Sequence, residues 1–75
     1  MKRATIRTTH ERAAAVAAAL EPDNTTEMET TVGGEVVETT IARETTGGLR
    51  TSADDYVRNL IVADQTITDT TSNNE

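Results

Sequence analysis

Residues 47–65, GGLRTSADDYVRNLIVADQ, carry the clearest helical pattern in this sequence of 75 residues. Apolar side chains recur there at spacings of three and four, as they do on the buried stripe of an amphipathic helix. The spacing predicts a helix from about Leu49 or Ser52 to Asp64, which packs this stripe on a sheet. The stripe consists of Leu49, Ala53, Tyr56, Leu60, Ala63 and Ile67.

The N-terminal part of the sequence predicts a strand followed by a first helix. Residues 2–8 alternate between apolar and polar side chains, which is typical of a half-buried strand. Thr8 and Glu11 match the T-x-x-E capping box that opens many helices, so we expect a helix over about residues 11–20. The helix should end before Pro22, because the residue that precedes a proline resists the helical conformation.

Two more strands are expected between the helices. Residues 27–32 and 35–44 alternate in the same way, and Gly33-Gly34 between them predicts a tight hairpin turn. Residues 45–48 are expected to form a loop. The side chains expected on the core face of these strands are Met28, Val32, Val37, Thr39 and Ile41.

The predicted order is β-α-β-β-α, an α+β fold. The hairpin lets the third strand lie between the first two, so we expect a three-stranded antiparallel sheet in the order 1-3-2 with two helices on one face. This is a KH-like pattern, or a ferredoxin-like pattern that lacks its last strand. It leaves the first and second strands as open edges. We expect one domain over residues 1–67 and a disordered polar tail over 68–75.

The composition predicts a small core. Hydrophobic residues make up 35% of the chain, and Tyr56 is its one aromatic residue. Domains of this size usually need a disulfide, a metal or oligomerisation to be stable. The chain has no Cys, and His10 is its one histidine, so a disulfide, a metal site or another cofactor is not expected. We therefore expect a homodimer or a subunit of a complex.

The residue pattern does not favour an enzyme. A Ser-His-Asp site would need His10, which falls at a predicted helix start, where an exposed histidine is ordinary. Asp54 and Asp55 fall in the first turn of the second predicted helix, where carboxylates complement the helix dipole. Neither position predicts catalysis.

The charge balance disfavours autonomous nucleic-acid binding. Thirteen acidic residues against seven basic ones give a net charge of −6. Affinity for nucleic acids depends largely on neutralising phosphates, and the G-x-x-G loop of KH domains does not occur in this sequence. Local basic positions remain on the first strand, at Arg3 and Arg7, and on the second helix, at Arg50 and Arg58.

The first helix gives the strongest indication of a protein partner. Residues 13–20, AAAVAAAL, contain no polar side chain, although a helix on a sheet needs only one apolar face. Ala14 and Ala18 fall outside that face, where small side chains would let another helix approach closely. In the second helix, Val57 and Ile61 also fall beside the core stripe.

The second helix resembles that of the archaeal Pcc-type subunit of the KEOPS complex. The matching residues are Leu49-Arg50, Asp54-Asp55-Tyr56, Arg58-Asn59-Leu60 and Val62-Ala63. The element order, the short length and the Glu21-Pro22 break are similar to that family as well, over about residues 2–67.

The resemblance implies a non-catalytic homodimer at the centre of KEOPS. Each protomer would pack its helices on an ATPase-like threonylcarbamoyl transferase, and the assembly would form threonylcarbamoyl-adenosine in tRNA. By position, Ala14, Ala18, Val57 and Ile61 would contact the transferase, and Arg50 and Arg58 would be the tRNA contacts.

Two alternatives stay open: a stand-alone KH-like RNA-binding protein, and a structural homodimer unrelated to RNA. We expect a cytoplasmic protein, because the chain has no Cys and no stretch that approaches the ~20 apolar residues of a membrane helix. The excess of acidic residues and the single lysine, Lys2, favour adaptation to a high-salt cytosol.

Overall fold

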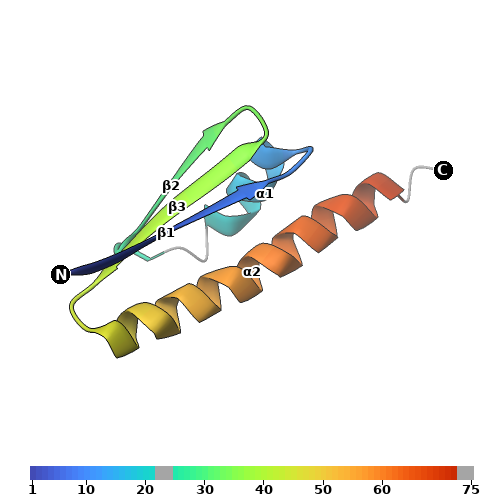
Figure 1. Ribbon diagram of the computed structural model, residues 1–75. Coiled ribbons are helices and arrows are strands. Elements are labelled where there is room, and N and C mark those ends of the chain that lie inside the picture. The colour runs from blue at the N-terminus through green and yellow to red at the C-terminus, as the bar shows by residue number, and fades with distance from the viewer. Residues whose placement is uncertain (22–24, 73–75) are drawn as a thin grey trace.

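The computed structural model describes residues 1–21 and 25–72 of the chain. The elements follow the order β-α-β-β-α (Figure 1). They are β1 (Lys2–Thr9), α1 (Ala13–Leu20), β2 (Met28–Gly33), β3 (Val36–Arg43) and α2 (Thr46–Ser72). Both helices lie on one face of the sheet, so the predicted α+β architecture is confirmed.

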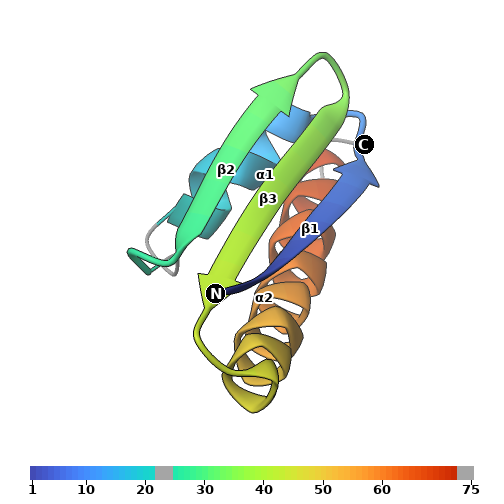
Figure 2. The same cartoon turned by 60° about the vertical axis from the view of Figure 1, so that its left-hand side comes forward.

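The sheet has β3 in its centre, in the predicted order β1-β3-β2 (Figure 2). Both outer strands pair antiparallel with β3, and Thr39 lies opposite Ile6 on one side and Thr30 on the other. Even-numbered residues of β1 and β2 and odd-numbered residues of β3 face the helices. Within the described residues, β1 and β2 each have one unpaired edge.

The hairpin between β2 and β3 forms as predicted, one residue later in the chain. Gly33 is the last residue of β2 and pairs with Val36, so the two turn residues are Gly34 and Glu35. Gly34 has a φ of +60°, and Glu35 does not have a positive φ. This is the pattern of a type II′ turn, which places glycine first because a side chain there would strain the backbone.

The core lies between the sheet and the two helices. Its buried cluster consists of Val16, Leu20, Ile41, Tyr56, Leu60 and Ala63. A short chain of hydrogen bonds crosses this core, because the Thr39 hydroxyl donates to the Tyr56 hydroxyl over 2.6 Å and contacts the Thr30 hydroxyl over 2.7 Å. These hydrogen bonds link α2, β3 and β2, so the buried hydroxyl groups of Thr39 and Tyr56 each have a hydrogen-bond partner.

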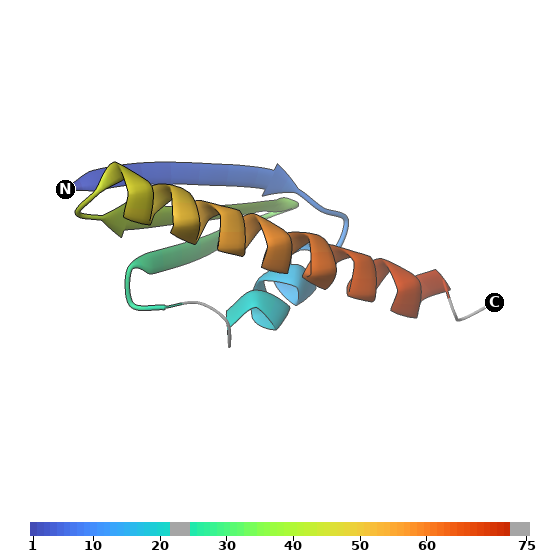
Figure 3. The ribbon, with the colours of Figure 1, turned by 90° about the horizontal axis from the view of Figure 1, so that it is seen from below.

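The predicted limits of the second helix, Leu49 or Ser52 to Asp64, are wrong at both ends. α2 begins at Thr46 and continues to Ser72, a length of 27 residues and about 40 Å. Its C-terminal turns extend past the sheet (Figure 3). Thr45 explains the early start, because its hydroxyl accepts from the Gly48 N–H over 2.9 Å and its carbonyl accepts from the Leu49 N–H. A domain limit at residue 67 stays a prediction, and residues 73–75 of the predicted tail lie outside the described residues.

The first helix is shorter than predicted, and its capping box does not form. α1 begins at Ala13, Arg12 takes the N-cap position, and no side chain caps the helix. Thr8 cannot serve as the cap because β1 continues to Thr9 and the Thr8 hydroxyl contacts His10 instead. The predicted break at Pro22 lies outside the described residues.

The described residues contain no helix that is long and apolar enough to cross a membrane.

Candidate partner interface

The six side chains predicted to contact partners belong to residues that are all exposed. Among the apolar ones on α2, Val57 is 39% exposed and Ile61 is 58% exposed. The six residues are Ala14 and Ala18 on α1 and Arg50, Val57, Arg58 and Ile61 on α2. Their positions relative to one another decide which of them one partner can cover.

Ala14 and Ala18 lie on the outer side of α1, next to an open groove against β2. The groove has a volume of about 640 Å³. Val32, which is 43% exposed, closes its β2 side. The lining residues are Ala14, Ala17, Ala18, Glu21, Met28, Thr30 and Val32.

A second groove, of about 220 Å³, runs along the other side of α1, against α2. Ala19 lines it from α1 and Val62, 58% exposed, lines it from α2. The two grooves lie on either side of the same alanine helix, and their small and apolar lining residues are treated together. We call them the α1 surface, which comprises Ala14, Ala18, Ala19, Val32 and Val62.

Val57 and Ile61 do not belong to the α1 surface. Successive helical residues are about 100° apart, so Val57, Ile61 and Asp64 share one side of α2. Asp64 contacts His10, which directly follows β1. In Figure 3, β1 and α1 lie on opposite sides of α2. We call Val57 and Ile61 the β1 flank, and the four predicted interface residues therefore form two separate patches.

Arg50 and Arg58, the two predicted tRNA contacts, also lie in different places on α2. Arg58 lies 3.8 Å from Asp55 in an exposed ion pair, the kind that contributes at most about 1 kcal/mol. It borders a polar groove of about 300 Å³ between α2 and the start of β2. Arg50 lies two turns earlier in α2, on the side of the β1 flank. The pair does not form one basic patch.

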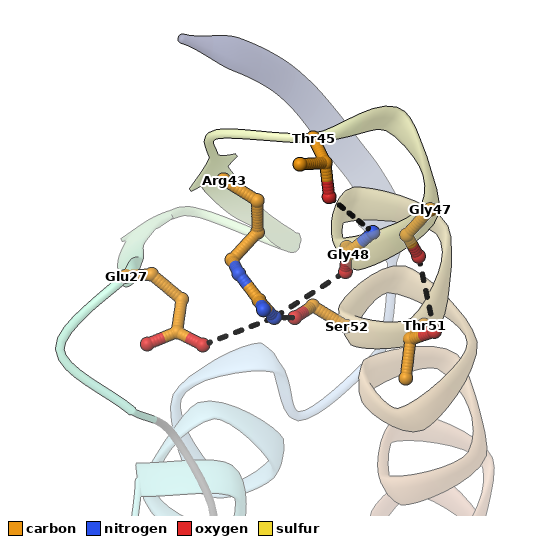
Figure 4. Close-up of polar contacts among 7 residues, drawn as sticks. All are labelled: Glu27, Arg43, Thr45, Gly47, Gly48, Thr51 and Ser52. Carbon is orange, nitrogen blue, oxygen red and sulfur yellow. Dashed lines mark hydrogen bonds and ion pairs between the residues drawn. The ribbon is translucent and has the colours of Figure 1, made fainter.

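Arg43 has a role that sequence analysis missed. Its Nη1 donates to Ser52 Oγ over 2.5 Å and to the Gly48 carbonyl over 3.3 Å, and it lies 3.6 Å from Glu27 Oε1 (Figure 4). The pKa of Glu27 is lowered, first by a hydrogen bond from the Thr25 side chain, then by its own backbone N–H, and also by the Arg43 charge. Arg43 therefore positions the start of α2 against β3.

His10 is not the exposed histidine that its position predicted. Its side chain is only 9% exposed. Nδ1 lies 2.7 Å from Asp64 Oδ1, and Nε2 lies 2.7 Å from the Thr8 hydroxyl. Carboxylate, imidazole and hydroxyl follow the order of a hydrolase triad, but here they join the end of β1 to α2. In the described part of the chain no three His, Cys, Asp or Glu side chains gather as metal ligands.

A family model described as "Transcription factor Pcc1" matches residues 5–68, which extend from β1 into the C-terminal half of α2. No curated protein matches the chain.

Proposed function

The chain belongs to the Pcc1 family of KEOPS subunits, and on that premise we propose that it is the dimerisation subunit that bridges two catalytic subunits. KEOPS forms threonylcarbamoyl-adenosine in tRNA, and the family supplies a non-catalytic subunit to it. The finer parts of the proposal are the homodimer, the transferase contact and the tRNA contact.

The separation of the α1 surface from the β1 flank is the observation that carries the proposal. A bridging subunit needs one surface for its own copy and another for the catalytic subunit, and both must be free at the same time. Ile61 and Val62 are each 58% exposed and point to different sides of α2, and Ile61 shares its side with exposed Val57. Two exposed apolar surfaces on different sides suit two partners.

We assign the α1 surface to the ATPase-like threonylcarbamoyl transferase. Ala14 and Ala18 keep the role predicted for them, and Val32 and Val62 extend the surface on either side. Alanine side chains let a partner helix approach the α1 backbone closely, and the two flanking grooves offer places for its larger side chains. Val57 and Ile61 lie outside this surface, on the β1 flank.

Replacement of Ala18 with arginine tests this assignment. Ala18→Arg places an unpaired charge in the centre of the contact, so its affinity for the transferase subunit should fall at least about 10-fold in calorimetry. Thr31→Arg is the matched control, because Thr31 is exposed on the face of the sheet that the helices do not cover. Equal affinity of the wild type and Ala18→Arg would rule out the α1 surface as the contact.

We propose that tRNA is contacted through the assembled complex, at Arg50 and Arg58. Reversal of either charge should weaken tRNA binding by KEOPS, and each lost phosphate contact should lower the salt dependence by about one counterion. Lys2→Glu is the control for the change in net charge. An unchanged salt dependence in both arginine variants would exclude them as phosphate contacts.

The alternatives are less well supported by the charge of the chain. The words "transcription factor" in the family description point to DNA, and a stand-alone KH-like protein would bind RNA. Both would need phosphate contacts, which a net charge of −6 opposes. Salt-sensitive binding of RNA or DNA by the isolated protein would favour one of them. A homodimer that binds neither transferase nor nucleic acid would favour a structural role.

We also propose that the protein works in the cytoplasm of a cell with high internal salt. The support is its composition, with thirteen acidic residues, seven basic residues and one lysine.

A further inference from the structure

β2 is the outer strand of the sheet on the side opposite β1 (Figure 2). It pairs with β3 alone among the described strands, in an unbroken register from Met28 to Gly33. Strand edges that stay uncovered often carry a lysine, a proline or a bulge, which hinder pairing with another chain. The residues of β2, METTVG, include none of these, so its free edge is suited to accept a further strand.

Two backbone contacts show which groups lie along this edge. Ala42 donates its N–H to the Glu27 carbonyl, so Glu27 directs its carbonyl towards β3. The direction of the backbone groups alternates along an antiparallel strand, and Met28 accordingly donates its N–H away from β3, to the Thr25 carbonyl. By the same alternation, Val32 directs both its N–H and its C=O towards the free edge. Val32 is therefore the residue to which an added strand would bond.

The groove between α1 and β2 lies on the helix side of this edge. Met28 and Val32 line it from β2, and Ala14, Ala17 and Ala18 line it from α1. The alanine side chains are small, so the groove keeps an open volume of about 640 Å³. Residues directly opposite each other in an antiparallel pair point to the same face. The residues of an added strand opposite Met28 and Val32 would therefore place their side chains in this groove.

The start of β2 is acidic. Glu21 lines the groove together with Met28, and Glu29 follows Met28 on the opposite face of the sheet. Both glutamates are exposed, and neither forms an ion pair with another described residue. No basic side chain is among the described residues that line the groove. Basic side chains on an added strand would complement this end of the edge.

We propose that the free edge of β2 binds an extended, basic segment of another protein as a fourth strand, antiparallel to β2. Antiparallel pairing continues the pattern of the sheet and is the more stable kind per residue. Apolar residues of the segment fill the groove, and a basic residue between them lies beside Glu29. The site shares Ala14, Ala18 and Val32 with the α1 surface, but it goes beyond the transferase contact because it depends on the backbone of Val32.

A short blocked peptide in which valine alternates with lysine is the probe. With its valines in the groove, the valine N–H groups point at β2 and the lysine N–H groups point away. N-methylation of a central valine should therefore weaken binding at least about 10-fold in fluorescence anisotropy, since it removes a backbone donor. N-methylation of a central lysine should leave the affinity within about two-fold. Both peptides carry the same charge, so non-specific attraction to the acidic protein cannot separate them. Equal effects of the two methylations would overturn the inference.

Val32→Pro makes the matching change in the protein. Proline is accepted in an edge strand where the N–H faces away from the neighbouring strand, so β2 should still pair with β3, and circular dichroism checks the fold. Val32→Pro should weaken peptide binding at least about 10-fold, whereas Val32→Ile, which keeps the N–H, should stay within about two-fold. If Val32→Pro does not fold, the two methylated peptides still decide the question on the wild type.

The charge of the segment is tested separately. A peptide with glutamate in place of lysine should bind the wild type at least about 10-fold more weakly than the lysine peptide. The double variant Glu21→Gln, Glu29→Gln should narrow this difference. A difference that the two substitutions leave unchanged would overturn the assignment of a basic segment to this end of β2.

The failures are distinguishable from those of the proposed function. Absence of peptide binding to the wild type, or equal binding to Val32→Pro, overturns this inference and leaves the transferase contact standing, because Ala18→Arg tests that contact. If Val32→Pro weakens self-association in sedimentation equilibrium and the peptide does not bind, the occupant of the edge is a second copy, which also overturns the inference.

Discussion

His10 Nδ1 lies 2.7 Å from Asp64 Oδ1, across 54 positions of the sequence. The contact joins the segment after β1 to the C-terminal half of α2. Because Nε2 of the same ring contacts the Thr8 hydroxyl, the imidazole connects strand and helix through both of its nitrogen atoms. The contact therefore helps to hold the C-terminal half of α2 against the end of β1.

His10→Ala should lower the free energy of unfolding by about 1–2 kcal/mol, since two partly buried hydrogen bonds are lost. For a domain of this size, each kcal/mol corresponds to a fall in Tm of about 4–8 °C. Thermal unfolding followed by circular dichroism measures the change. Asp54→Ala, at an exposed acidic position on the same helix, should stay within about 0.5 kcal/mol of the wild type. If both variants unfold at the same temperature, the contact contributes nothing to stability.

The two glycines at the start of α2 should respond in opposite ways to alanine. A Cβ at Gly47 would meet open space, so Gly47→Ala should stabilise the protein by about 0.5–1 kcal/mol through better helix propensity. A Cβ at Gly48 would lie 2.9 Å from Thr45 Oγ1 and 3.0 Å from Arg43 Nη2. Gly48→Ala should therefore gain nothing or destabilise, because it disturbs the cap and the arginine contact together. Urea unfolding of the pair checks this, and an equal gain at both positions would contradict it.

The fold could be predicted because its signals are local. Alternation over the three strands, the glycines of the hairpin and the apolar stripe from Leu49 to Ile67 each depend on neighbours within a few residues. The sheet order then followed from connection rules alone. The exposed alanines of α1 were also found from their helical positions.

The start of α2 and the candidate site could not be predicted in full. They depend on contacts between residues that are far apart in the sequence, and on local patterns that fit more than one structure. Gly47-Gly48 indicates a loop, and only the Thr45 cap and the Arg43 contacts show why it is helical. Val62 follows Ile61 directly in the helical pattern. Which of the two lies beside Ala14 and Ala18 of the α1 surface depends on the side of α2 against which α1 packs. The sequence alone does not show which side of α2 packs against α1.

Stability should fall with acid partly through Glu27. Its pKa is below the ordinary value of 4.5, so its contribution to stability is present above pH 4.5 and is lost as the pH falls through the lowered pKa. Glu27→Gln should therefore differ from the wild type at about pH 7 and approach it as the pH falls through the lowered pKa. Thr25→Val, which removes the largest cause of the shift, should reduce the same pH dependence. Denaturant unfolding at several pH values measures it, and a wild-type advantage that persists in acid would contradict the assignment.

Stability should rise with potassium chloride if the acidic surface is an adaptation to salt. Raising the concentration from about 0.1 M to about 2 M shortens the Debye length from about 10 Å to below about 3 Å and screens the repulsion within a net charge of −6. Screening also weakens ion pairs such as that of Arg58 with Asp55, but such exposed pairs contribute little. Relief of repulsion should therefore prevail, with a rise in Tm on the order of 5 °C. A variant with Glu29→Gln and Asp54→Asn carries two fewer negative charges at exposed positions and should show a smaller rise. A Tm that falls with salt, or a rise that the two neutral substitutions do not reduce, would show that the excess of acidic residues has another origin.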